Sequence, residues 1–119
     1  VPCIQILHCI EKEVTGGLST LVDGYTVTEN LKKAPIDISF DARDADALRI
    51  VFDLLEEEGL IMGGSTGINI IGAMKLAKKL GPGSTIVTIL CDYGTRYFSK
   101  VYNKKFLKSK KLPIPKWIK

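Results

Sequence analysis

Residues 60–91, which read LIMGGSTGINIIGAMKLAKKLGPGSTIVTILC, decide the fold. The run Leu60-Ile61-Met62 predicts a short buried strand, and residues 85–90 form a nearly continuous β-branched run, typical of a central strand covered on both faces. Between them the apolar spacing predicts a helix over residues 68–80. Two strands joined by a helix predict a right-handed βαβ unit with parallel strands, and therefore an α/β fold. The apolar face expected for this helix comprises Ile70, Ala73, Met74, Ala77 and Leu80.

Helices are expected on both sides of this unit. Residues 44–58 predict an amphipathic helix that Asp41 or Asp44 can cap and that Gly59 ends. Its apolar stripe is expected at Leu48, Val51, Leu54 and Leu55. A further helix is predicted over roughly residues 95–108. Residues 41–108 are therefore expected to form the α/β core.

The two ends of the chain carry weaker patterns. Residues 1–14 give only a weak helical pattern, and residues 15–40 carry turn chemistry that predicts a long loop. Residues 109–119 read as a tail. The chain starts Val1-Pro2-Cys3-Ile4, without Met or a signal pattern, so we expect it to be cut from something longer.

The composition is that of an ordinary globular domain. The 119 residues are 45% hydrophobic and 25% charged, which argues against a disordered chain, and no apolar run reaches the length of a membrane span. The odd count of cysteines (Cys3, Cys9 and Cys91) argues against a disulfide scaffold and favours a reducing compartment. His8 has no second His with which to share a metal, so we expect it to be structural or exposed.

The net charge of +4 arises largely near the C-terminus. A lysine-rich end could bind nucleic acid, but no nucleic-acid motif accompanies it, and we favour a solvated helix and arm. Apolar residues between the lysines are expected to anchor the segment by packing. They are Val101, Phe106, Leu107, Leu112, Ile114 and Trp117.

The glycine-rich turn at residues 63–67, Gly-Gly-Ser-Thr-Gly, carries the most chemistry. It lies at the carboxyl end of a predicted strand, where open α/β sheets bind ligands, and glycine lets a ligand approach the backbone. A hydroxyl there can equally cap the following helix. The pattern is neither a P-loop nor G-x-G-x-x-G, so spacing alone gives only a possible small-ligand turn.

Residues 54–96 resemble the cysteine synthase and cystathionine β-synthase family, whose enzymes depend on pyridoxal 5'-phosphate (PLP). The family's motifs occur in order: an acidic helix end, the glycine–serine turn, an Ala-rich helix, an apolar strand ending in Cys-Asp, then Gly and Arg-Tyr. Here they are Glu57-Glu58-Gly59, residues 63–67, Cys91-Asp92, Gly94 and Arg96-Tyr97. The resemblance covers about residues 20–119 and is closest to cysteine synthase. It implies the C-terminal portion of the two-domain, tryptophan-synthase-β-like fold (fold-type II), with a parallel sheet.

The resemblance also implies roles for residues. In this family the first Ser of the turn, Ser65 here, hydrogen-bonds the pyridine nitrogen of PLP. A neutral hydroxyl cannot stabilise a pyridinium charge as a carboxylate would, which suits β-elimination. Other positions expected to bind the cofactor are Gly63, Gly64, Thr66 and Cys91, and the remaining substrate loop is expected at Asp23 and Gly24.

Some family features are missing or altered. The Schiff-base lysine and the phosphate-binding loop have no counterpart in these residues, and the substrate loop looks about three residues short. Tyr93 stands where a small residue is common. We expect no catalytic residue and no metal ligand in this chain.

The reaction implied for the full-length enzyme is β-replacement, cysteine synthesis from O-acetylserine and sulfide. The alternatives are cystathionine β-synthase chemistry on serine and homocysteine, an inactive paralogue, or a non-enzymatic α/β binding module. The family also implies a homodimer with a small-molecule amino-acid substrate, in the cytoplasm or the mitochondrion. We expect no nucleic-acid or membrane partner.

Overall fold

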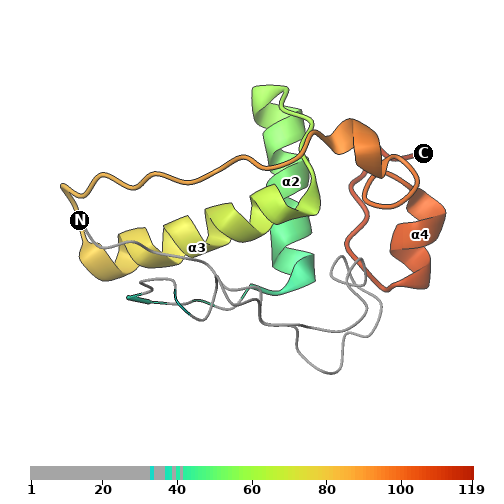
Figure 1. Ribbon diagram of the computed structural model, residues 1–119. Coiled ribbons are helices and arrows are strands. Elements are labelled where there is room, and N and C mark those ends of the chain that lie inside the picture. Colours follow the sequence, from blue (N-terminus) through green and yellow to red (C-terminus); the bar gives the residue numbers. More distant parts are fainter. Residues whose placement is uncertain (1–32, 34–36, 39, 41) are drawn as a thin grey trace.

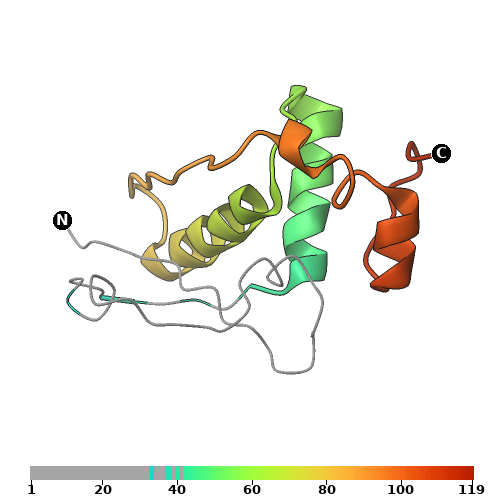
Figure 2. The ribbon, with the colours of Figure 1, turned by 45° about the vertical axis from the view of Figure 1, so that its right-hand side comes forward.

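The computed structural model describes residues 33, 37–38, 40 and 42–119. Three parts follow one another in space (Figure 1): helix α3, Gly64–Leu80, then helix α2, Asp44–Glu58, then the C-terminal segment with helix α4, Lys104–Ser109. Helix α2 lies between the other two, and the turned view in Figure 2 agrees. The predictions for residues 1–14 and most of the 15–40 loop fall outside the described residues.

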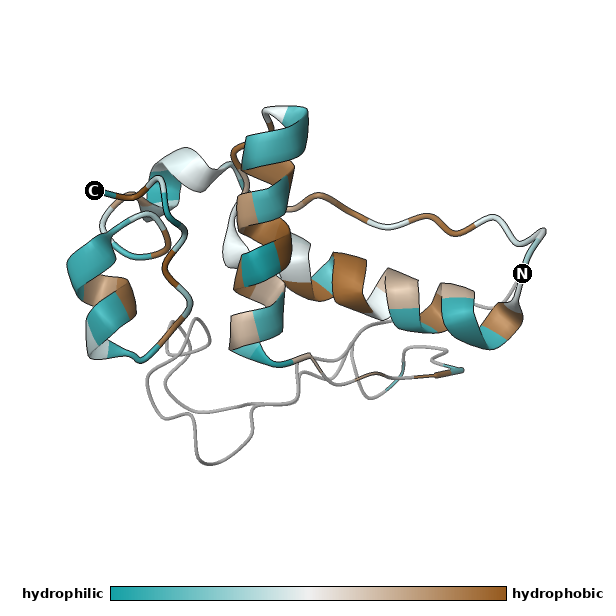
Figure 3. Cartoon of the chain, turned by 180° about the vertical axis from the view of Figure 1, so that it is seen from behind, coloured by the Kyte–Doolittle hydropathy of each residue, from teal (hydrophilic) through white to brown (hydrophobic). Residues whose placement is uncertain are grey.

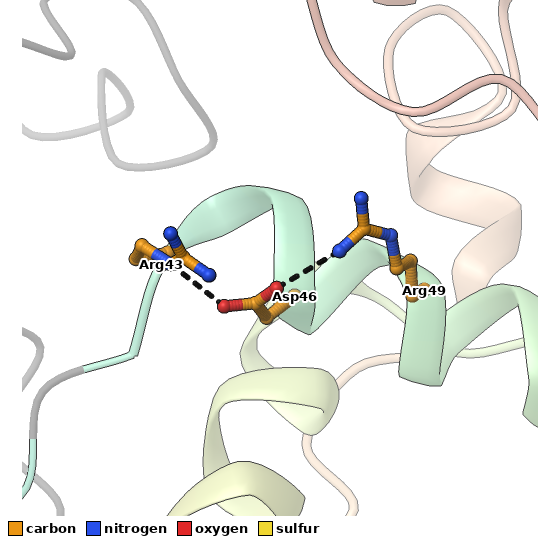
Figure 4. Close-up of polar contacts among 3 residues, drawn as sticks. All are labelled: Arg43, Asp46 and Arg49. Atoms are coloured by element: carbon orange, nitrogen blue, oxygen red, sulfur yellow. Dashed lines mark hydrogen bonds and ion pairs between the residues drawn. The ribbon is translucent and has the colours of Figure 1, made fainter.

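Helix α2 has the predicted bounds. It ends at Gly59, whose left-handed backbone (φ 69°) lets its N–H bond the carbonyl of Leu54. At its start the N-cap residue is Arg43, without a side-chain cap bond, so Asp44 is the first helical residue and not the cap. Asp46 instead pairs with Arg43 and Arg49 on the exposed face (Figure 4), at 2.8 and 3.0 Å. Exposed pairs of this kind contribute little to stability.

Helix α3 begins earlier than predicted, at Gly64, so most of the glycine turn forms its first helical turn. It ends at Leu80 as predicted, with Gly81 as its C-cap. The expected apolar face was wrong, because Met74 and Leu80 are about half exposed. The buried residues are Gly64, Thr66, Gly67, Ile68, Gly72 and Leu76. At Gly67, helix α3 lies directly against Ala47 and Val51 of α2.

The predicted parallel strands are not confirmed. Among the described residues, neither 60–62 nor 85–90 forms a strand, and Met62 makes one isolated antiparallel bridge, to Tyr93. Residues 84–91 run back along α3 (Figure 1), and the side chains of Val87, Ile89 and Leu90 are exposed, Val87 at 89%. Figure 3 shows this segment as a hydrophobic ribbon outside the helices. Without neighbouring strands in the described part, the β-branched run has nothing to pair with.

The helix predicted over residues 95–108 was also wrong as a single element. A short 3₁₀ helix, η2, covers Gly94–Tyr97, a turn follows, and α4 begins only at Lys104. Asn103 explains the division, since its side-chain oxygen accepts a bond from the N–H of Phe106 and caps α4. The N-cap backbone of Asn103 is extended, which interrupts any continuous helix.

The main core lies between α2 and the C-terminal segment. Leu48, Val51 and Phe52 of α2 pack against Val101, Leu107 and Leu112. This confirms three of the expected packing anchors, and Phe106 packs on the same cluster from a partly buried position. Trp117 is partly exposed, yet its ring packs edge to face on the ring of Phe52, with the ring centroids 5.8 Å apart. The lysines between these anchors, from Lys104 onward, are exposed, as a solvated arm requires.

No helix in the described part of the chain combines the length and apolar character needed to cross a membrane.

Candidate functional site

The glycine turn lies where α3 begins. Gly63 is the N-cap residue, in extended backbone, and Gly64, Ser65 and Thr66 form the first turn. The first N–H groups of any helix have no partner within the helix, and the helix dipole makes this end attractive to electron-rich atoms. The turn thus presents backbone donors and a hydroxyl at one place.

The two hydroxyls of the turn face different surroundings. Thr66 is fully buried, and its Oγ1 accepts a 3.0 Å bond from the backbone N–H of Cys91. Ser65 is exposed, and its hydroxyl bonds no residue that the structure describes. Thr66 is therefore engaged within the protein, whereas Ser65 is free to meet a small molecule.

The residues around Gly63 leave no room for a side chain. A Cβ on Gly63 would lie 2.7 Å from Cε2 of Tyr97, and the N–H of Gly63 donates to the carbonyl of Asp92 at 2.8 Å. The return bond runs from the N–H of Gly94 to the carbonyl of Ile61, at 2.9 Å. These two bonds form the Met62–Tyr93 bridge and hold the loop after residue 91 against the turn.

Helix α2 supports the turn from behind. A Cβ on Gly67 would overlap the backbone carbonyl of Ala47, and it would lie 3.0 Å from Cγ2 of Val51. Only glycine permits this approach of the two helices. The start of α3 is thus fixed against the core through main-chain contact.

Asn69 was not singled out by the sequence, yet it joins the site. It lies one helical turn after Ser65, and its Nδ2 donates to the carbonyl of Ile89 at 2.9 Å and to Sγ of Cys91 at 3.2 Å. With the Thr66 bond, this fixes the extended segment along α3. The sequence shows only that an amide side chain follows the turn serine by four residues. It does not show the partners of this amide, which lie 20 and 22 residues further along the chain.

Tyr97 and Asp92 form a second feature that the sequence did not reveal. The Tyr97 hydroxyl donates to Oδ2 of Asp92 at 2.6 Å. This bond raises the pKa of Tyr97 above its usual value, and burial adds to the rise. Tyr102 bonds the carbonyl of Met62 at 2.6 Å, and burial raises its pKa too.

The polar side chains at the turn differ in how far they are engaged. Ser65 offers a neutral, exposed hydroxyl, while Asp92 has its carboxylate engaged by Tyr97. Cys91, a free and exposed thiol, is tied to Thr66 and Asn69 beside the turn. The expected sites at Asp23 and Gly24 lie outside the described residues, as do His8, Cys3 and Cys9.

The lysines of α3 lie beyond its first turn. Lys75, Lys78 and Lys79 are exposed in the second half of α3, as expected for solvated residues. Among the described residues no cluster of His, Cys, Asp or Glu could hold a metal ion. What this part of the chain offers is hydrogen bonding and backbone shape for a small molecule.

Comparison with known proteins gives a consistent set of relatives. The chain is 48% identical over 80 residues to a cysteine synthase of Dictyostelium discoideum, covering 67% of the chain and 21% of that protein. It is 39% identical over 106 residues to cysteine synthase 2 of Schizosaccharomyces pombe, covering 88% of the chain and 26% of that protein. An O-acetylserine-dependent cystathionine β-synthase of Bacillus subtilis is 35% identical over 74 residues, covering 62% and 24%.

The chain thus spans about a quarter of the length of these curated relatives. No family model matches it.

Proposed function

The chain belongs to the cysteine synthase and cystathionine β-synthase family, and on that premise we propose that it is the C-terminal part of a PLP-dependent cysteine synthase. The complete enzyme would take O-acetylserine and sulfide to cysteine and acetate. Its fold would be the fold-type II arrangement, in which strands from the rest of the protein pair with residues 60–62 and 85–90. Residues 109–119 would form the C-terminal tail that follows the core.

One observation supports this function above the others: the turn separates its two hydroxyls. Thr66 is buried and bonded to Cys91, so Ser65 is the hydroxyl left exposed where α3 begins. We assign Ser65 to the ring nitrogen of PLP. Gly63 and Gly64 would let the backbone approach the ring, while Thr66 and Cys91 would contribute by shaping its edge.

PLP, when bound, supplies an electron sink for loss of acetate and addition of sulfide. This chain would supply the hydrogen-bonding groups at one edge of the PLP ring. Ser65 is neutral at every working pH, so it orients the ring nitrogen without holding a positive charge there. The lysine that binds PLP covalently and the phosphate contacts would come from another part of the enzyme. Asp23 and Gly24 would lie on the substrate loop.

We further propose a homodimer in the cytoplasm, with the mitochondrion as the alternative compartment. The partner molecule is a small amino-acid substrate, and neither nucleic acid nor a membrane is expected as a partner. The exposed lysines from Lys104 onward are anchored by apolar residues packed on α2, which suits a solvated arm.

The substrate is tested by assaying the complete protein with four combinations: O-acetylserine or serine, each with sulfide or homocysteine. Cysteine formation from O-acetylserine and sulfide is the expected result. Cystathionine formation from serine would identify cystathionine β-synthase instead. PLP binding without product would identify an inactive paralogue, and a protein that binds no PLP would contradict the proposal.

The site is tested by Ser65→Ala in the same protein. Removing one neutral hydrogen bond of about 1 kcal/mol should leave PLP bound and lower turnover about fivefold. Ser84→Ala, an exposed serine beyond the other end of α3, is the matched control and should behave as the wild type. If the Ser65→Ala enzyme has unchanged kinetics and an unchanged cofactor spectrum, the assignment of Ser65 to the ring nitrogen is rejected.

A further inference from the structure

We propose that Tyr97 is a positioning residue for Ser65, acting through Asp92 and Gly63; this inference rests on the proposed function. Three contacts lead from Tyr97 to the first turn of α3.

The first contact is the bond from the Tyr97 hydroxyl to Oδ2 of Asp92, at 2.6 Å. The second is backbone to backbone: the carbonyl of Asp92 accepts from the N–H of Gly63 at 2.8 Å. The same residue, Asp92, is therefore held by its side chain and holds the turn by its main chain. Hydrogen bonds to an ionised carboxylate are shorter and stronger than neutral ones, which makes this a firm link.

The third contact is steric. Cε2 and Cδ2 of Tyr97 lie 2.7 and 3.2 Å from the place where a Cβ of Gly63 would be. The ring thus fills the space that Gly63 leaves empty and limits how far the turn can shift. Gly63 is the N-cap residue of α3 and stands two residues before Ser65. Its position sets the direction in which the first turn leaves the cap.

Tyr97 itself is held in place by its neighbours. It packs against the core cluster of Leu48, Val51 and Val101 from a partly buried position. The carbonyl of Tyr97 also accepts bonds from the N–H groups of Lys100 and Tyr102, at 2.9 and 3.3 Å. The tyrosine therefore connects the rigid core to the turn, and its hydroxyl is the part that reaches Asp92.

The substitution Tyr97→Phe removes that hydroxyl and keeps the ring over Gly63. In the complete enzyme we expect kcat to fall about fivefold, the effect of one hydrogen bond, with KM changed less. The absorption and fluorescence of bound PLP should change in the same direction as in Ser65→Ala. Tyr93→Phe is the matched control: it is the same chemical change in the adjacent loop, on an exposed side chain, and should have no effect.

A double-mutant cycle separates positioning from general support. If Tyr97 acts through Ser65, Tyr97→Phe should cost nothing further once Ser65 is already Ala. The inference would be overturned if the fold-losses in kcat of the two substitutions multiply and their changes to the cofactor spectrum add. It would also be overturned if Tyr97→Phe has the same kcat and cofactor spectrum as Tyr93→Phe. If Tyr97→Phe does not fold, Asp92→Asn takes its place in the cycle under the same two criteria.

The two proposals fail differently. A wild-type enzyme that binds no PLP rejects the proposed function, and with it this inference. A wild-type enzyme that is active, with Tyr97 and Ser65 independent in the cycle, rejects only the role of Tyr97.

Discussion

The side chain of Thr66 and the backbone of Cys91, 25 residues apart, meet in a single 3.0 Å hydrogen bond. Thr66 is fully buried, so its hydroxyl is shielded from water. The bond joins the first turn of α3 to the end of the extended segment that follows this helix. It determines which of the two adjacent hydroxyls, Ser65 or Thr66, remains available to a ligand.

Thr66→Val should therefore destabilise the protein although it keeps the shape of the side chain. The N–H of Cys91 would lose its partner, at a cost of about 1–3 kcal/mol. Thr66→Ser, which retains the hydroxyl, is the control and should lose less. Thermal unfolding of both variants in the complete enzyme is the measurement. Equal stability of Val and Ser variants would contradict the importance of this bond.

Gly67→Ala should loosen the contact between α2 and α3. The added Cβ would overlap the carbonyl of Ala47, so the helices must separate, at a cost of about 1–3 kcal/mol. Alanine is the better helix former, so helix propensity alone predicts the opposite sign. Ala77→Ser, on the exposed side of the same helix, is the control. A Gly67→Ala protein as stable as the wild type would show that the helices can readjust freely.

Because of the Tyr97–Asp92 bond, the free energy of unfolding should decrease as the pH becomes strongly alkaline. The bond to Asp92 and burial raise the pKa of Tyr97 above the usual 10.0, so the folded protein favours the protonated phenol. This stabilisation is fully present below pH 10.0, and it is lost as the pH rises through the folded pKa. Near-ultraviolet titration of wild type against Tyr97→Phe measures it.

The control for this titration is Asp53→Asn, on the exposed face of α2, which should leave the pKa of Tyr97 unchanged. Asp92→Asn should lower that pKa towards its usual value, because the largest cause of the shift is the bond to the carboxylate. A Tyr97 that titrates identically with and without the Asp92 carboxylate would contradict the interaction.

The 119-residue chain alone should not perform the reaction. Covalent binding of PLP needs a neutral amine, and an ordinary hydrated lysine is almost fully protonated at neutral pH. Borohydride reduction of the purified chain with PLP, followed by mass spectrometry, should label exposed lysines sparsely, including those of the C-terminal segment. Stoichiometric labelling of one lysine, with cysteine formed from O-acetylserine and sulfide, would contradict this prediction.

Local patterns predicted the helices best. The spacing of Leu48 and Val51 and the stop at Gly59 are properties of neighbouring residues, and α2 has the predicted bounds. The buried face of α3 was missed because burial depends on what lies outside the helix, here the carbonyl of Ala47 against Gly67. The break between η2 and α4 could have been found, since Asn103 is a strong helix cap.

The glycine pattern located the turn, and the resemblance added the roles expected of its residues. The structure joins Thr66 and Cys91 there through one hydrogen bond, beside the exposed Ser65. Asn69 was missed because its partners lie 20 and 22 residues further along the chain. Tyr97 was named as a motif residue, but neither its bond to Asp92 nor its contact with Gly63 was predicted. The role of Ser65 towards PLP stays a prediction.

The exposed segment at residues 85–90, TIVTIL, has a consequence for the purified chain. From Leu80 to Cys91 there is no charged residue, and within the six residues there is no Pro or Gly. Short β-prone segments of this composition, when accessible, stack into cross-β fibrils through their own backbone groups. Asp92 is the first charge that could act as a gatekeeper. The isolated chain should therefore form fibrils that bind thioflavin T on standing. The substitution Val87→Lys, at an exposed position, should delay fibril formation.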